Sequence, residues 1–444
     1  MSEKKELRTI PATKIKRAAR FVRTGAKVGR NYATHYTKKL FNRDLERSEL
    51  DSKNAEDIYK ELSQLKGSAL KIAQMMSMDK GLLPREYVQK FALAQYSAPP
   101  LSGPLVVKTF RQYFGKGPEE VFDEFELEAI NAASIGQVHR AKKDGKELAV
   151  KIQYPGVAQS VRSDLRLVRP WAARFMKVSD KDLAPIFEEV EERLLEECDY
   201  NLELERSMEI SAACAHIPNL VFPKYYPEYS TERIITMDWL EGKHMKEFME
   251  TSPSDELRNQ LGQALWDFIN FQMHELGKVH ADPHPGNFLM TPEGKLGVLD
   301  FGCVKVVPPD FYRNYFSVIH PAVRNDPERM LETIYGLELL DKEDTEADKA
   351  FVLDLMEQFL QLVEQPFYSE RFDFGDDDYM DSLYDFGLRV GQMSDAQKNA
   401  GRGSKHAIYI NRTFFGLFSL LNDMKATVNS ADKYILKMDL EPVH

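Results

Sequence analysis

Two short stretches of the chain place oxygen-bearing side chains at spacings that suit chemistry on phosphates. In HADPHPGNF, Asp282 and Asn287 are five residues apart, and thirteen residues after the asparagine the segment LDFG contains Asp300. Mg²⁺ is a hard ion that prefers oxygen ligands, so the carboxylate of Asp300 and the amide oxygen of Asn287 are candidate metal ligands. Asp282 is then the candidate catalytic group that orients a phosphoryl acceptor.

The same spacing is typical of the H-R-D-x-x-x-x-N and D-F-G motifs of protein kinases. Pro283, Pro285 and Gly286 disfavour a helix between the two polar residues, which predicts a fixed loop suited to a preorganised site. His280 and His284 could ligate a metal, but in a proline-rich loop we interpret both as side chains that hold the backbone.

A hairpin that could position a nucleotide is predicted upstream. QVHRA and ELAVKIQ alternate apolar and polar residues around KKDGK, whose Asp-Gly pair is typical of a hairpin turn. A loop rich in small residues, NAASIGQ, precedes the first strand, and Lys151 lies in the second strand. Backbone N–H groups and an ammonium suit phosphates. We therefore assign nucleotide binding to Lys151 and to the loop residues Ala132, Ala133, Ser134, Ile135, Gly136 and Gln137.

A functional lysine that is shielded from water needs a carboxylate partner, because an isolated ammonium is costly to bury. In DLAPIFEEVEERLLEECDY, Val190, Leu194 and Glu197 fall on one face of a predicted helix. We predict that Glu197 pairs with Lys151. The alternative is a solvated acidic helix whose apolar stripe ends just before Glu197.

Length and composition indicate an ordinary globular protein with more than one lobe. The 444 residues are 43% hydrophobic and 29% charged, and a chain of this length can build two cores. Cys198, Cys214 and Cys303 lack metal-ligand spacing, so neither a zinc site nor a disulfide framework is expected. The start, MSEKKELRTI, has no apolar segment of a secretory signal. We expect a cytoplasmic protein.

Charge is distributed unevenly along the chain. The net charge is −11, yet residues 7–40 contain Lys and Arg and no Asp or Glu. The segment 14–30 has the pattern of a thin amphipathic helix with basic residues around most of its circumference. We expect a peripheral contact with an anionic membrane surface. A nucleic-acid arm is disfavoured by the acidic remainder of the chain, and a solvated or disordered tail is the remaining alternative.

Five motifs occur in this order along the chain: AASIGQVHRA, AVKIQYPGV, EECDYNLE, HADPHPGNF and LDFG. In these motifs and their order the chain resembles the UbiB family of atypical kinases, also called AarF-domain kinases. The resemblance runs from about residue 62 to about residue 429. It implies an α+β, two-lobed protein-kinase-like fold with an N-terminal helical extension and a mostly helical C-terminal lobe. The expected divisions are a basic segment (1–50), the extension (51–125), the N-lobe (126–240) and the C-lobe (241–444).

The resemblance also implies a lid over the nucleotide site. The family motif K-x-G-Q corresponds to KIAQ here, with Lys71 and Gln74. By resemblance these residues meet the acids of an E-x-D motif, Glu197 and Asp199, with Glu203 close by. Such a lid would block the groove that a protein substrate needs, and the chain has no A-P-E activation segment. We therefore expect a phosphotransferase or ATPase that is not a general protein kinase.

Two positions depart from the family pattern. Ala73 stands where the family usually has glycine, and Asn131 replaces the first alanine of the loop. These departures leave open how the lid sits and whether ATP or ADP is preferred.

The function implied by the resemblance is ATP (or ADP) binding with Mg²⁺ in support of isoprenoid-quinone, such as ubiquinone, or other lipid metabolism, with a quinone-like lipid as a candidate partner. Two alternatives remain. HADPHPGN is also similar to the loops of aminoglycoside and choline kinases, which indicates a small-molecule kinase, and a non-catalytic regulator could use nucleotide as a switch. No nucleic-acid partner is expected.

Overall fold

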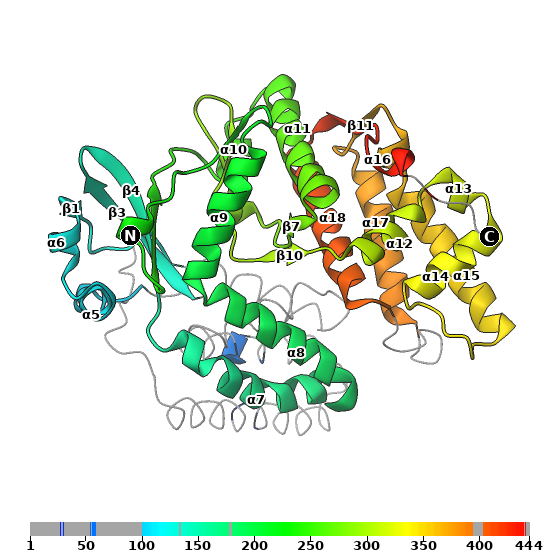
Figure 1. The fold of residues 1–444 in the computed structure, drawn as a ribbon, viewed down its shortest axis with the longest axis horizontal. Coiled ribbons are helices and arrows are strands. Elements are labelled where there is room, and N and C mark those ends of the chain that lie inside the picture. Colours follow the sequence, from blue (N-terminus) through cyan, green and yellow to red (C-terminus); the bar gives the residue numbers. More distant parts are fainter. Residues whose placement is uncertain are drawn as a thin grey trace, which may run out of the picture. The chain divides into compact units, whose positions relative to one another are not determined.

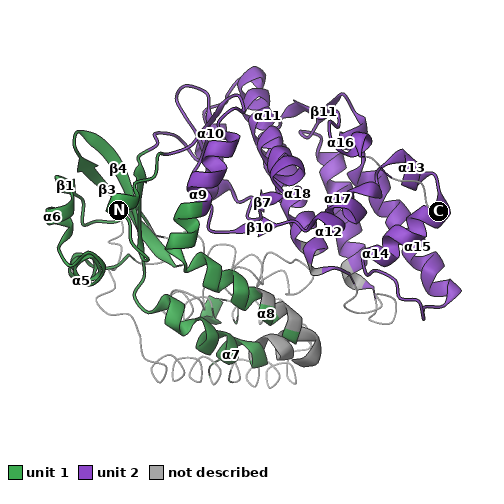
Figure 2. Cartoon of the chain, in the orientation of Figure 1, with its two compact units in different colours: residues 1–205, 224–239 green, residues 206–223, 240–444 purple. Residues whose placement is uncertain are grey.

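The structure, a computed structural model, describes residues 100–132, 135–176, 180–393, 403–438 and 440, together with 27, 30, 54 and 56–58. The predicted lid residues Lys71 and Gln74, and the loop residues Ala133 and Ser134, lie outside the described residues. The chain forms two compact units, residues 1–205 with 224–239 and residues 206–223 with 240–444 (Figure 2). The second unit thus includes residues 206–223, which the sequence analysis assigned to the N-lobe.

The first unit is built on an antiparallel sheet (Figure 1). Its strands are β1 (Glu124–Phe125), β2 (Asn131–Ala132), β3 (Gly136–Lys143), β4 (Lys146–Gln153) and β6 (Ile234–Asp238). Its helices are α5 (Gly103–Phe114), α6 (Pro118–Val121), α7 (Val157–Met176), α8 (Asp180–Glu197) and the first turns of α9 (Tyr200–Cys214).

The predicted hairpin is confirmed as β3 and β4. Lys143 pairs with Lys146 in the register, and Asp144 and Gly145 occupy the turn with φ values of +50° and +77°. Two successive left-handed residues give a turn whose twist matches that of the flanking strands, which explains the Asp-Gly pair. The carboxylate of Asp123 accepts hydrogen bonds from the Asp144 N–H (2.8 Å) and from Lys143 Nζ (2.9 Å). The turn is therefore held from the β1 side of the sheet.

The core of the first unit joins α5, the sheet and the α7–α8 pair. Alternation along β3 and β4 buries Ala141, Leu148, Val150 and Ile152. The predicted apolar stripe of α8 is also confirmed, because Val190 and Leu194 are buried in the same cluster. An ion pair between Arg162 and Glu191 (2.8 Å) links α7 to α8 at the surface.

The second unit is mostly helical. Its helices are the remainder of α9, α10 (Met245–Met249), α11 (Asp255–Phe271), α12 (Pro309–Ser317), α13 (Pro321–Arg324), α14 (Pro327–Gly336), α15 (Glu346–Val363), α16 (Gln365–Tyr368), α17 (Asp377–Gln392) and α18 (Lys405–Asp423). Its short strands are β5 (Leu220–Val221), β7 (Lys278–His280), β8 (Phe288–Met290), β9 (Leu296–Val298), β10 (Val304–Val306), β11 (Arg371–Asp373) and β12 (Thr427–Asn429).

Helix α11 and the strands after it set the position of the catalytic loop. Ser254 caps α11 by accepting a hydrogen bond from the Leu257 N–H, and buried residues such as Leu265 and Phe268 face the core. A π-helical turn, Gln272–Leu276, ends at Gly277 with φ +60°, and β7 begins one residue later. Strand β7 pairs with β10, and β8 pairs with β9. The loop 281–287 therefore leaves one short ladder and enters another.

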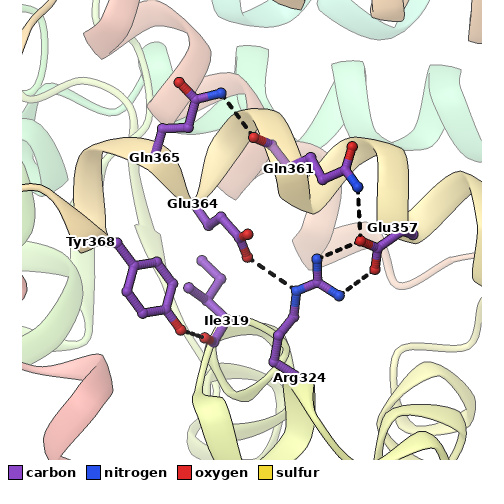
Figure 3. A network of polar contacts seen from close by, with 7 residues as sticks. All are labelled: Ile319, Arg324, Glu357, Gln361, Glu364, Gln365 and Tyr368. Atoms are coloured by element: carbon purple, nitrogen blue, oxygen red, sulfur yellow. Dashed lines mark hydrogen bonds and ion pairs between the residues drawn. The ribbon is translucent and has the colours of Figure 1, made fainter.

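A network around Arg324 ties α13 to α15 and α16 within the second unit (Figure 3). The Arg324 guanidinium donates to both carboxylate oxygens of Glu357, with the Nη2–Oε1 contact at 2.7 Å, and to Glu364 at 3.2 Å. Hydrogen bonding to Glu357 raises the pKa of Arg324. A guanidinium that bonds two carboxylates stabilises a fold more than a single ion pair at the surface does. We therefore interpret this network as a structural link between these helices.

None of the helices in the described part of the chain is sufficiently long and apolar to cross a bilayer.

Candidate functional site

The loop predicted to bind phosphates contains fewer residues than the predicted range 131–137, because both ends of that range lie in strands. Asn131 pairs with Val138 and Ala132 with Gln137, so β2 and β3 form a second hairpin with the loop at its tip. Ile135 and Gly136 are buried. A Cβ atom at Gly136 would lie 2.8 Å from the Ile152 carbonyl oxygen and 2.8 Å from the Tyr200 hydroxyl. Only glycine fits here, because β4 and the start of α9 both approach the strand closely.

Lys151 has a carboxylate partner in Glu203, whereas the pattern of the sequence predicted Glu197. Its Nζ lies 2.5 Å from Glu203 Oε1, and the side chains are 14% and 4% exposed respectively. Glu197 is the last residue of α8, whereas Glu203 lies in the first turn of α9. Helical periodicity predicted one helix for the segment up to Tyr200. The chain instead breaks at Cys198 and Asp199, and α9 supplies the acid.

The aromatic ring of Tyr200 completes this cluster. Tyr200 is fully buried, and the Lys151 ammonium lies 5.1 Å from its ring centroid. An ammonium between a carboxylate and a ring face is compensated twice, by ion pairing and by the ring quadrupole. Tyr200 was not predicted from sequence, where only its adjacency to the E-x-D motif could have marked it.

The E-x-D acid Asp199 has a local structural role in the described residues. It is exposed, its Oδ1 accepts a hydrogen bond from the Leu202 N–H (3.2 Å), and its carbonyl accepts one from the Glu203 N–H (3.0 Å). Asp199 therefore caps α9, which orients the turn that carries Glu203. Contact with the lid residues stays a prediction.

A second set of residues holds the α8–α9 junction against the sheet. The Cys198 carbonyl accepts hydrogen bonds from Gln153 Nε2 (3.0 Å) and Arg233 Nη1 (2.5 Å), and Arg233 also donates to Gln153 Oε1 (2.9 Å). Because β4 also carries Lys151, this bridge sets the position of α9 relative to the lysine. Arg233 was missed by the sequence analysis, since nothing in its local pattern marks it.

Gln137, predicted to bind nucleotide, uses its side chain elsewhere. Its Oε1 accepts a hydrogen bond from the Leu101 N–H (2.7 Å) and its Nε2 donates to His139 Nε2 (2.8 Å). His139 Nδ1 in turn donates to the Glu126 carbonyl (2.8 Å). This largely buried chain of hydrogen bonds anchors the segment before α5 to β3. The Gln137 side chain is therefore a structural bridge, and nucleotide binding by this residue stays a prediction.

The catalytic-loop residues lie in the second unit. The Asn287 Nδ2 donates to the Asp282 carbonyl (2.9 Å), which commits the nitrogen end of the amide and leaves Oδ1 as the end available to a metal. His284 accepts a hydrogen bond from the Gly286 N–H (3.0 Å) and begins a 3₁₀ turn, Pro285–Asn287. The predicted fixed loop and the backbone-holding role of His284 are confirmed.

His280 holds the segment that carries Asp300. Its Nε2 donates to the Asp300 carbonyl (2.7 Å), and the ring is buried. Asp300 Oδ1 accepts a hydrogen bond from the Gly302 N–H (2.7 Å). Together with the Ala281 N–H to Cys303 carbonyl bond (2.9 Å), these contacts fix the Asp282 and Asp300 loops to each other. His280 is thus a positioning residue, as predicted.

Within the described ranges, no group of three or more His, Cys, Asp and Glu side chains could hold a metal ion. Mg²⁺ in nucleotide sites is usually held by one or two carboxylates with phosphates and waters. The carboxylate of Asp300 fits that donor set, and so does the amide oxygen of Asn287, whose nitrogen is already hydrogen-bonded.

Comparison with known proteins identifies the family of this chain. Residues 93–334 match the model of the ABC1 atypical kinase-like domain, a range that includes Lys151, Glu203, Asp282, Asn287 and Asp300. The chain belongs to this family of atypical kinases. As a family member it is a kinase-like protein with an α+β protein-kinase-like fold, and the resemblance to UbiB and AarF-domain kinases is confirmed.

Individual relatives show the same affiliation. An uncharacterized aarF domain-containing protein kinase of the Arabidopsis thaliana chloroplast is 31% identical over 71% of this chain and 45% of its own length. Atypical kinase COQ8B, mitochondrial, of Rattus norvegicus is 30% identical over 84% of this chain and 72% of the relative. The chain spans 37% to 61% of the length of the first four curated relatives that it matches.

A solved structure shares the fold. The structure of Rv3197 from Mycobacterium tuberculosis in complex with erythromycin is 28% identical, with a TM-score of 0.60, over 86% of this chain and 94% of that chain. Several relatives are named for the mitochondrion or chloroplast, so the cytoplasmic location stays a prediction.

Proposed function

We propose that this chain is an atypical kinase or ATPase that binds ATP or ADP with Mg²⁺. The observation that supports it most is the shielded Lys151–Glu203 pair, 2.5 Å apart, beside the β2–β3 hairpin. A lysine held this way is a point charge of fixed position for nucleotide phosphates. Burying the pair is costly, which makes a purely structural role a poor explanation for it.

Residues of the second unit would bind the metal ion and orient the acceptor during phosphoryl transfer. Asn287 Oδ1 and the Asp300 carboxylate would hold Mg²⁺, which would neutralise phosphate charge. Asp282 would accept a hydrogen bond from the acceptor hydroxyl or water and orient it. His280, His284 and the Asn287 amide nitrogen would keep these oxygens in place before the nucleotide arrives.

For the acceptor we propose a small molecule of isoprenoid-quinone or other lipid metabolism, and not a generic protein. The support is the family resemblance and the names of the relatives as atypical kinases. The membrane contact proposed from the basic N-terminal segment would bring the chain to such lipids.

The first prediction tests nucleotide binding. Asp300→Asn should weaken Mg-ATP or Mg-ADP binding at least about tenfold. An amide binds Mg²⁺ more weakly than a carboxylate does, and without the metal the negative charge of the phosphates is uncompensated. Isothermal titration calorimetry with and without EDTA measures this. Asp310→Asn is the matched control, since Asp310 is exposed in the first turn of α12. Equal affinity in folded Asp300→Asn and wild type would remove Asp300 from the metal site.

A turnover measurement separates the candidate functions. ATP consumption is followed with and without lipid extracts and quinone precursors, and small-molecule products are identified by mass spectrometry. A released phosphorylated sugar or amine would identify a small-molecule kinase of the aminoglycoside or choline type instead. Persistent binding without turnover would identify a nucleotide-switched regulator.

A further inference from the structure

A pocket in the second unit contains none of the residues assigned to nucleotide or metal. Its volume is about 180 Å³. One face of α11 forms a wall, with Trp266, Asp267, Asn270 and Phe271. The other walls are the turn 216–218 after α9, Phe367 of α16 and the segment 429–434, which begins at the last residue of β12.

The walls are held in place by hydrogen bonds. Gln263 of α11 donates to the Asn429 carbonyl (3.2 Å) and accepts from the Asn429 N–H (2.7 Å). The Asp432 N–H donates to the Phe367 carbonyl (3.2 Å). Both carboxylate oxygens of Asp432 accept hydrogen bonds from the backbone N–H groups of Tyr434, Ile435 and Leu436. The segment opposite α11 is therefore fixed, and the pocket does not depend on a loop that is free to close.

Two side chains of α11 that line the pocket carry acceptor oxygens. Asn270 is only 5% exposed, and its Nδ2 donates to the Trp266 carbonyl (2.9 Å), so Oδ1 is the end that remains; no donor in the described residues bonds to it. Asp267 Oδ1 accepts from Gln263 Nε2 (3.1 Å), and no basic side chain in the same part of the chain forms an ion pair with this carboxylate. Burial raises the pKa of Asp267. A ligand with N–H groups would donate to these oxygens in place of water.

The remaining lining combines aromatic rings with Ile217, Pro218 and the polar segment 429–433. Trp266 lies 5.7 Å from Phe367 between ring centroids, and His216 packs edge-on against Phe271 at 4.6 Å. Phe271 and Tyr434 add further ring surface to the pocket. Ring faces attract cations, and carboxylates attract ammonium groups. A cavity of about 150 Å³ is known to hold benzene, so this volume fits one ring or its equivalent.

From these contacts we propose that the pocket binds a small organic ammonium with a single ring, with Asp267 and Asn270 accepting its N–H groups and Trp266, Phe271 and Phe367 enclosing its apolar part. The ligand class follows from the Asp267 carboxylate and the Asn270 amide oxygen, which accept N–H groups, and from the aromatic rings beside them. This proposal does not depend on the phosphoryl-transfer function.

Benzylamine is a suitable probe, and benzyl alcohol is its neutral counterpart. With the full chain, saturation-transfer NMR titrations should show saturable benzylamine binding with a dissociation constant of about 1 mM, and about tenfold weaker binding of the alcohol. Asp267→Asn should reduce benzylamine affinity about tenfold and leave benzyl alcohol nearly unchanged. Asp310→Asn, exposed on α12, is the control for charge.

Changing Lys433 tests whether the side chain of this lysine itself occupies the pocket. This exposed lysine lines the pocket and acts electrostatically on Asp267. Lys433→Ala should strengthen benzylamine binding, because it removes a like charge. Binding that appears only in Lys433→Ala would show that the lysine itself fills the pocket and would overturn the proposal. Equal affinity in wild type and Asp267→Asn, or no saturable binding in wild type and Lys433→Ala, would overturn it as well.

Discussion

The pair of Lys151 and Glu203 defines the chemistry available to the first unit. Both side chains are shielded, and an ion pair in that environment is costly to form and more costly to break on one side. Tyr200 and the capping of α9 by Asp199 hold the glutamate at the lysine. The lysine is thus presented to the hairpin in one position.

The second prediction compares the two candidate glutamates. Glu203→Gln should weaken nucleotide binding and lower the free energy of unfolding by about 3 kcal/mol, because it leaves the Lys151 ammonium without its carboxylate. Glu197→Gln, the matched control, should cost less than about 1 kcal/mol, because Glu197 is only partly buried at the end of α8. Urea denaturation and calorimetry measure both effects. The reverse order would restore the pairing predicted from sequence.

The sequence could predict that Lys151 needs an acid, but not which acid. Helical periodicity puts Glu197 on an apolar face, and that face is real, since Val190 and Leu194 are buried. The break at Cys198 is stabilised by Gln153 and Arg233, and Arg233 is 35 residues from Cys198 in sequence. Such a contact leaves no local signal. By contrast, the loop of Asp282 and Asn287 was predictable, because proline and glycine act locally.

His139 gives a third prediction at the residue scale. Burial lowers the pKa of His139 to about 4, below its ordinary value of 6.5. The unfolded chain therefore binds a proton as pH falls through 6.5, whereas the folded ring stays neutral until about pH 4. The stability contributed by the neutral ring is complete above 6.5 and declines below it, by on the order of 3 kcal/mol at pH 4.

NMR of ring-labelled histidines tests this directly. The His139 resonance, assigned by its loss in His139→Gln, should not titrate between pH 8 and pH 5, while exposed histidines should, and the urea midpoint should fall over the acidic half of this range (about pH 6.5 to 5). A midpoint near pH 6.5 for the His139 ring would show that it is protonated within its hydrogen-bonded site.

At the scale of elements, the sheet and the first turns of α9 act as one support. The β2–β3 hairpin, the β3–β4 hairpin and α9 meet at Gly136, where Ile152 and Tyr200 leave no space for a side chain. Gln137 and His139 secure the next residues of β3 to Leu101 and Glu126. Movement of the phosphate loop is therefore coupled to the position of the helix that carries Glu203.

Gly136→Ala is the fourth prediction. The new methyl group would be 2.8 Å from a backbone oxygen of β4 that cannot rotate away, so we expect a loss of about 1 to 3 kcal/mol of stability together with weaker nucleotide binding. Gly387→Ala is the control, because this exposed α17 position has open space around it. That change should be neutral or stabilising by up to about 1 kcal/mol. Thermal unfolding of the two variants decides the point, and equal behaviour would mean that the strands shift apart easily.

The elements themselves were largely predictable where the cause is local. The Asp-Gly turn fixed the β3–β4 hairpin, and alternation fixed its buried face. The β2 strand was not predicted, because two residues carry no period, and its existence depends on pairing with β3. The pocket beside α11 also had no sequence signal, since its walls come from residues 216 to 434.

For the whole molecule, the described contacts in the N-terminal segment modify the membrane proposal. Lys27, one of the basic residues of the predicted amphipathic helix, forms an ion pair with Asp57 at 2.7 Å, and Asp57 is the more buried partner. Part of the basic charge is therefore used within the chain. Deleting residues 1–40 would remove this ion pair together with the membrane-binding charge, so a deletion cannot separate the two effects.

The fifth prediction is that the chain binds anionic membranes reversibly through the remaining basic residues. Each lysine or arginine near an anionic surface contributes about 1 kcal/mol, so changing Lys16, Arg17, Arg20 and Arg23 to Gln should weaken binding about a thousandfold. The matched control changes four exposed lysines elsewhere, Lys116, Lys243, Lys342 and Lys437, by the same net charge.

Liposome sedimentation distinguishes this contact from a general attraction between charges. Wild type and the control variant should sediment with anionic liposomes at low salt, fail to bind neutral liposomes and dissociate as the Debye length falls toward about 8 Å at physiological ionic strength. The N-terminal variant should stay in the supernatant while its Mg-nucleotide affinity is unchanged, because Lys27 and its pair with Asp57 are retained. Equal sedimentation of both variants would place the membrane contact outside residues 14–30. Loss of sedimentation in both would show that only total charge matters.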